Sequence, residues 1–164
     1  MSWIVIVANL GAIAGGLTFG HFSEKIGRVN AITIAAIIAL PAIYLWAFSA
    51  TPVLLAIGAF IMQVAVQGAW GVIPVHLNEL SPGNVRGTFP GFTYQLGNLI
   101  TAYAAQWEAA FATKNFPLPG TATANYGHAM QIIMLGVFVV VFIVTAIGPE
   151  KRGISFTEEA KAAA

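Results

Sequence analysis

Polar side chains occur at helical spacing inside two of the long apolar stretches of this sequence. The first set is Gln63, Gln67, Trp70 and Pro74, and the second is Tyr94, Asn98 and Thr101 with Gln95 beside them. Residues at intervals of three and four share one face of a helix. Buried amides and phenols need hydrogen-bond partners, so these two faces are expected to meet a polar cavity or a partner helix. A cavity that binds a small polar solute is favoured, with interhelical hydrogen bonds, typically about 0.6 kcal/mol each, as the alternative.

The sequence contains no arrangement typical of an enzyme. Its three histidines, His21, His76 and His128, are far apart, and no cysteine is present, so no metal site is predicted. The serines have no nearby histidine–carboxylate pair, and no phosphate-binding glycine-rich loop followed by lysine occurs. We therefore predict a protein that is not an enzyme and that uses no cofactor.

The composition predicts a chain that is surrounded by lipid. Hydrophobic residues make up 58% of the 164 residues and charged residues only 8%, whereas soluble domains carry about 25% charged residues. A net charge of +1 offers no basic surface for nucleic acid. The predicted partner is the lipid bilayer.

Five apolar stretches are long enough to cross a bilayer, which takes about 20 helical residues. We expect transmembrane helices over 3–20, 31–50, 51–76, 87–112 and 126–148. The fold class predicted is all-α integral membrane, with a transmembrane domain over 1–150 and a tail over 151–164.

The basic residues predict the orientation. With five spans, six of the seven fall on one side of the membrane: Lys25, Arg28, Arg86, Lys151, Arg152 and Lys161. Only Lys114 falls on the other side. The positive-inside rule then places loops 21–30 and 77–86 and the C-terminus in the cytoplasm. A first span that starts outside also leads us to expect further spans upstream of Met1.

The charged loops carry a recognisable pattern. The residues Gly20, Glu24, Lys25, Gly27 and Arg28 form the pattern Gly-x-x-x-acid-base-x-Gly-Arg, which resembles a cytoplasmic loop of the major facilitator superfamily. After the third stretch, Glu79, Ser81-Pro82 and Arg86-Gly87-Thr88 resemble a second loop of that superfamily. The longer strings His-Leu-Asn-Glu-Leu-Ser-Pro (76–82) and Tyr-Gln-Leu-Gly-Asn (94–98) are similar to proton-coupled permeases for lactate, pyruvate or sialate.

This resemblance implies a fold and a function. The five stretches would be spans eight to twelve of a twelve-helix transporter, and the N-terminal half would form the other wall of the pathway. The implied activity is symport of a small organic acid with a proton by alternating access, in the plasma or inner membrane. Gln63, Gln67, Tyr94, Gln95 and Asn98, together with Trp70, would line the cavity. Glu24, Arg28, Glu79 and Arg86 would form a cytoplasmic gate.

Two other functions remain open from the residues alone. No lysine or arginine lies within a predicted span to meet a carboxylate, and no mid-membrane carboxylate is available to carry a proton. A carrier of sugars or polyols is therefore one alternative, because amides and aromatic rings also suit hydroxyl-rich solutes. A five-span membrane protein that binds a partner and transports nothing is the other.

Overall fold

The computed structural model describes residues 2–120 and 123–154, and these residues form helices joined by short connections. The helices are α1 (Ser2–Ile26), α2 (Arg28–Ala47), α3 (Pro52–Leu80), α4 (Phe89–Thr101), α5 (Ala104–Asn115) and α6 (Tyr126–Ile147). Within the described residues the only β-type pairing is an isolated bridge between Pro117 and Ala124. The predicted all-α membrane fold class is confirmed.

Four of these helices are long and apolar enough to cross a membrane. They are α1 from Trp3, α2, α3 and α6. Each contains most of a predicted span, and α1 and α3 run beyond theirs by several residues at the C-terminal end. These extensions bring the ends of the two helices, and the charged residues that they carry, to the same end of the molecule.

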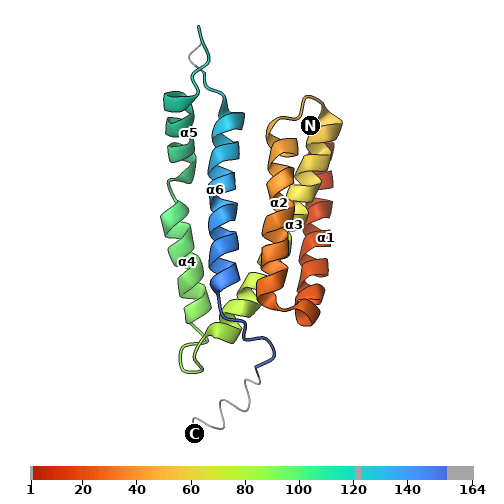
Figure 1. The fold of residues 1–164 in the computed structure, drawn as a ribbon, viewed down its shortest axis with the longest axis vertical. Coiled ribbons are helices and arrows are strands. Elements are labelled where there is room, and N and C mark those ends of the chain that lie inside the picture. The colour runs from red at the N-terminus through yellow and green to blue at the C-terminus, as the bar shows by residue number, and fades with distance from the viewer. Residues whose placement is uncertain (1, 121–122, 155–164) are drawn as a thin grey trace.

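The fourth predicted span, 87–112, differs from the structure, which has two helices there. A turn at Ala102 and Tyr103 separates α4 from α5, and it is Tyr103 that leaves helical dihedral angles. Just before the turn, the hydroxyl of Thr101 donates to the carbonyls of Gly97 (3.0 Å) and Asn98 (3.4 Å), a type of bond that can bend helices. The amide of Ala102 then bonds only three residues back, to Leu99. The two short helices lie end to end on one side of α6 (Figure 1).

Helices α1 and α3 approach each other closely through glycine. A Cβ atom at Gly15 would overlap the carbonyl oxygen of Val64, and one at Gly71 would lie 2.9 Å from the carbonyl oxygen of Gly16. Small residues at helix interfaces allow this approach in membranes, where van der Waals contact and not water release holds helices together. The seam between α1 and α3 is therefore made largely of backbone atoms.

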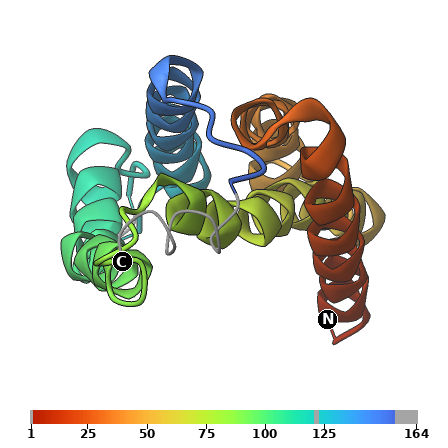
Figure 2. The same ribbon diagram turned by 90° about the horizontal axis from the view of Figure 1, so that it is seen from below.

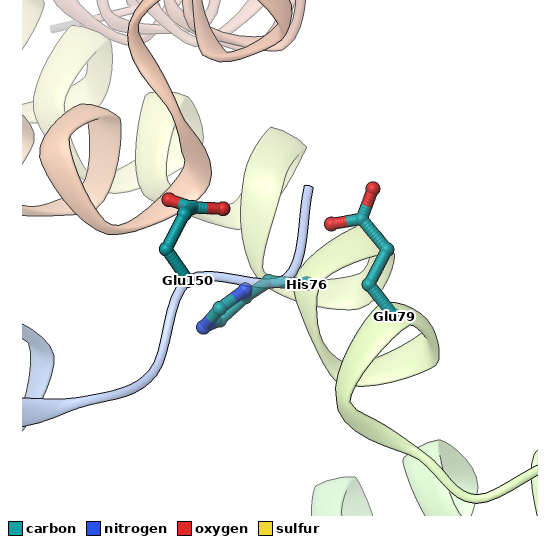
Figure 3. Close-up of side chains that lie close together, drawn as sticks. All are labelled: His76, Glu79 and Glu150. Carbon is teal, nitrogen blue, oxygen red and sulfur yellow. The ribbon is translucent and has the colours of Figure 1, made fainter. Parts of the chain in front are cut away.

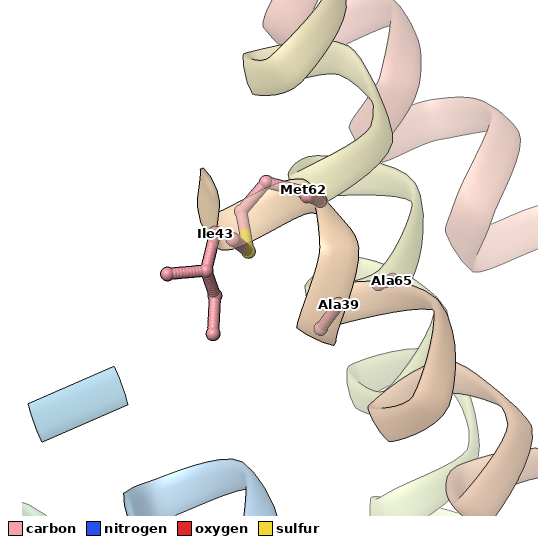
Figure 4. Packing of buried hydrophobic residues seen from close by; sticks show 5 residues of the cluster. Ala39, Ile43, Met62 and Ala65 are labelled. Carbon is pink, nitrogen blue, oxygen red and sulfur yellow. The ribbon is translucent and has the colours of Figure 1, made fainter. Parts of the chain in front are cut away.

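Helix α2 packs on the other side of α3 through alanine and larger apolar side chains. The buried cluster contains Ala39, Ala42 and Ile43 of α2 with Met62 and Ala65 of α3 (Figure 4). Met134 and Phe138 of α6 pack against the cluster. Helices α1, α2 and α3 form one group in the end-on view, with α6 beside α2 and with α4 and α5 on the far side of α6 from α2 (Figure 2).

Candidate functional site: a charged network and a solute-sized cavity

A buried ion pair joins the start of α2 to the end of α3. The guanidinium of Arg28 donates from Nε to Oε2 of Glu79 and from Nη2 to Oε1, both at 3.1 Å. Their side chains are 5% and 6% exposed. A planar guanidinium matches a carboxylate in this two-bond arrangement, which fixes the relative position of the two groups.

Arg28 also bonds back to the end of α1. Its Nη1 donates to the hydroxyl of Ser23 (2.6 Å), and its Nη2 donates to Oε1 of Glu24 (2.7 Å). Ser23 is fully buried, whereas the carboxyl of Glu24 is largely exposed. One guanidinium thus connects α1, α2 and α3 at a single point.

The segment that follows α6 closes over the link between α1 and α2. Oε2 of Glu150 accepts the backbone N–H of Val29 (2.9 Å), which places a negative charge at the N-terminus of α2, where the helix dipole favours it. Arg152 donates to the carbonyls of Glu24 (3.1 Å) and Lys25 (2.6 Å) at the C-terminus of α1, the end at which a cation is favourable. The chain after α6 therefore caps two helices at once.

Gly27 is required at this contact. Its φ of 98° and ψ of 157° lie in a region that is almost restricted to glycine. A Cβ atom there would also lie 2.7 Å from the Glu150 carboxylate. The glycine of the loop pattern thus permits both the turn and the approach of the tail.

The other residues predicted for the gate lie near this network without joining the ion pair. Arg86 donates to the backbone carbonyls of Asn78 and Ser81, each at 3.0 Å, and so closes the loop after α3. Lys25 is exposed and contributes its carbonyl to Arg152. Gly20 has open space around it. Among the four gate candidates, the structure brings Glu24, Arg28 and Glu79 together.

A cavity of about 660 Å³ lies between α3 and α4. Its polar lining comes from Trp70, Thr93, Tyr94, Asn98 and Thr101. The rings of Trp70 and Tyr94 meet edge to face, with centroids 5.5 Å apart, an arrangement that aromatic pairs prefer. Volumes of this size hold small-molecule ligands.

Three of the six predicted cavity residues, Trp70, Tyr94 and Asn98, line this cavity. Gln95 lies beside it and accepts a hydrogen bond from the amide of Asn98 (3.2 Å). Gln63 and Gln67 are half-buried, one to two turns before Trp70 on α3, and are not among the lining residues. The substrate role of all six residues remains a prediction.

The cavity offers neutral hydrogen-bonding groups on an apolar wall. Among its lining residues in the described chain there is no lysine, arginine, aspartate or glutamate. Indole, phenol, amide and hydroxyl groups can orient a solute through hydrogen bonds, and the aromatic pair supplies a flat apolar contact. Such a wall can bind a small polar solute without holding it by charge.

The sequence alone did not indicate Ser23, His76 or Glu150 as candidate site residues. His76 could have been found from spacing, because it lies one helical turn before Glu79, whereas the contact of Ser23 with Arg28 depends on the turn at Gly27 between α1 and α2. Glu150 carried no local signal, since its position beside Gly27 depends on where α6 ends.

These features define the class of the protein: a multi-pass, all-α membrane protein with a solute-sized cavity between two helices. Residues 1–107 match the family described as sugar (and other) transporter, and the chain belongs to this family of the major facilitator superfamily. The predicted superfamily is confirmed, and its members are transporters and not enzymes.

Individual relatives differ in the solutes that they are named for. The chain is 37% identical over 158 residues to a carboxylic acid transporter protein homolog of Saccharomyces cerevisiae, covering 90% of this chain and 25% of that protein. It is 34% identical over 86 residues to the glucose transporter GlcP of Staphylococcus epidermidis, covering 51% and 19% of the two chains. It is 33% identical over 86 residues to inositol transporter 4 of Arabidopsis thaliana, covering 52% and 15%.

The chain spans about a quarter of the length of the yeast relative and less of the other two. No solved structure matches it.

Proposed function

We propose that this chain forms one wall of a secondary transporter that carries a small organic acid together with a proton by alternating access. The cavity between α3 and α4 is the observation on which the proposal rests. Similarity to the yeast carboxylic acid transporter homolog supports an acid as the solute, because that match extends over 90% of the chain, whereas the bacterial glucose transporter matches about half.

The cavity would contribute hydrogen bonds and shape to solute binding. The Asn98 amide has two N–H groups, and the bond to Gln95 occupies one of them. The second N–H and the Tyr94 hydroxyl are donors suited to a carboxylate oxygen. The balancing cation and the proton-carrying group would come from the opposite wall of the pathway, in the N-terminal half expected from the superfamily resemblance.

The network around Arg28 would hold the cytoplasmic end of this wall together while the wall moves. It connects α1, α2, α3 and the segment after α6 through charged hydrogen bonds, so these elements would move as one body. We assign this end to the cytoplasm and the protein to the plasma or inner membrane, because the basic residues gather here.

A sugar or polyol carrier is the second candidate. The observation that favours it is the neutral lining of the cavity, because hydroxyl-rich solutes are bound by amides, phenols and aromatic rings without a cation. The glucose and inositol transporters among the relatives are named for such solutes.

The two candidates can be separated with a chimera in which this chain replaces the matching quarter of the yeast relative. In cells, we expect uptake of lactate that requires an inward proton gradient and that stops when a protonophore is added. Uptake of glucose or inositol in place of lactate would favour the second candidate. A chimera that reaches the membrane, binds neither class of solute and transports neither would contradict both.

A further inference from the structure

Three side chains with metal-binding groups converge where the segment after α6 meets α3. His76 and Glu79 project from α3, and Glu150 approaches from the segment after α6 (Figure 3). One imidazole nitrogen and one oxygen from each carboxylate lie within 4.8 Å of one another. His76 and Glu79 are buried and Glu150 is exposed, so the group has a route from solvent.

His76 has an unmet bonding requirement. Its Nδ1 is buried and has no hydrogen-bond partner in the described part of the chain, and the whole residue is only 9% exposed. Buried polar atoms nearly always have a partner, and the exceptions call for a ligand, an ion or water. His76 also borders a second cavity of about 440 Å³, lined mainly by aliphatic residues of α2, α3 and α6. Neither Glu79 nor Glu150 is among the residues that line this cavity.

Both carboxylates have capacity left for a further contact. A carboxylate offers about four lone-pair positions. Glu79 uses two of them for Arg28, and Glu150 uses one for the N–H of Val29. Glu79 and Glu150 therefore each keep an oxygen lone pair that can bind an added cation.

We propose that His76, Glu79 and Glu150 bind a divalent transition-metal cation, with Zn²⁺ as the fitting ion. Imidazole with carboxylate suits Zn²⁺, whereas Mg²⁺ and Ca²⁺ prefer oxygen ligands alone. Ligand atoms within 4.8 Å of one another must each move inward by at most roughly 0.7 Å to reach zinc–ligand distances of about 2.0–2.2 Å. Small rotations of the three side chains would provide that movement, and water would complete the coordination.

Metal binding here would fasten the segment after α6 to α3. At present that segment is held to α1 and α2 by Glu150 and Arg152. A metal shared by His76, Glu79 and Glu150 adds a bond to α3 itself. The site would therefore act as a clamp at the end of the helices, separate from the solute cavity.

The test is zinc binding by the purified 164-residue chain in detergent, measured by competition with a chromophoric chelator. We expect one Zn²⁺ per chain with micromolar affinity, which millimolar Mg²⁺ does not reduce. His76→Gln and Glu150→Gln should each lower the affinity by roughly tenfold or more, since even second-shell losses cost 10–100-fold. Glu150→Gln keeps an oxygen that can accept the N–H of Val29. The matched control is His21→Gln, an exposed histidine at the same end of the molecule.

Trypsin provides a second measurement that reports on the clamp. Lys151 and Arg152 are exposed cleavage sites next to Glu150. Zn²⁺ should slow cleavage there in the unchanged chain and in His21→Gln, and leave the rate in His76→Gln and Glu150→Gln unaffected. Equal zinc affinity in His76→Gln and the unchanged chain would overturn the proposal, as would the absence of saturable binding.

Discussion

Arg28 and Glu79, 51 residues apart in the sequence, form a two-bond ion pair that is about 95% removed from solvent. Each charge is tolerable in that position because of the other. Burial of two charges costs several kcal/mol, and their attraction offsets that cost only when both are present in good geometry. The pair is therefore better understood as a device that fixes the position of α2 against α3 than as a large source of stability.

Removal of Arg28 alone should be strongly destabilising. Arg28→Met leaves Glu79 buried without its partner, which costs about 3–5 kcal/mol in comparable cases. The midpoint of thermal unfolding in detergent, followed by circular dichroism, would measure it. Lys25→Met, at an exposed site three residues earlier, should change the midpoint little. The double variant Arg28→Met/Glu79→Leu should recover at least half of the loss, and failure to recover would show that the burial of Glu79 is not the cause.

Gly27→Ala should release the segment after α6. The backbone at Gly27 is strained for any residue with a Cβ atom, by about 1–3 kcal/mol, and the new methyl group meets the Glu150 carboxylate. We expect faster trypsin cleavage at Lys151 and Arg152 and a lower unfolding midpoint. Gly20→Ala is the matched control, because this helical glycine has open space around it and alanine favours the helix by about 1 kcal/mol. Equal behaviour of the two variants would contradict the role of Gly27.

Single cysteines should report the orientation without interference, since the chain has none of its own. Gly83 lies in the loop after α3, at the end where the Arg28 network lies, and Thr123 lies at the opposite end, between α5 and α6. In intact cells an impermeant thiol reagent should label Thr123→Cys and leave Gly83→Cys unlabelled until the membrane is permeabilised. The reverse pattern would invert the proposed orientation.

Asn98→Ala should weaken solute binding in the chimera with the yeast relative. Loss of one hydrogen bond to a solute corresponds to about 0.5–1.5 kcal/mol, so the half-saturating concentration should rise roughly twofold to tenfold while the maximal rate changes less. Thr113→Ala, on the exposed face of α5, serves as the control. An unchanged half-saturating concentration for Asn98→Ala would remove this residue from the binding site.

The long helices could be predicted because the length of an apolar stretch is enough to identify a membrane-spanning helix. The break at Ala102 and Tyr103 could not, since no glycine or proline lies within four residues of Ala102 to mark it. Helices α1 and α3 also run beyond the predicted spans, because charged residues such as Glu24 and Glu79 are expected outside the hydrocarbon and so end a predicted span. Both carboxylates are on helices, and a shared guanidinium satisfies them.

The candidate site was predictable to the extent that helical spacing fixes it. Trp70 and Pro74 share a face of α3, and Tyr94 and Asn98 share a face of α4, and all four line one cavity. Spacing along a helix does not say which neighbour a face meets, so the positions of Gln63 and Gln67 relative to the cavity could not be predicted. Contacts of Glu150 and Arg152 with residues more than 120 positions earlier depend on the complete fold.

The glycine seam between α1 and α3 determines how this part of the protein responds to its surroundings. Backbone atoms of Gly15 and Val64 meet with no side chain between them, so contact there is made by dispersion forces and not by expulsion of solvent. An interface of this kind gains little stabilisation from the release of water, so it should lose little stability when detergent replaces lipid. Pairing of α1 with α3 should thus survive extraction from the membrane. Helix α4 has no buried residues, so its position should depend more on the lipid or detergent around it.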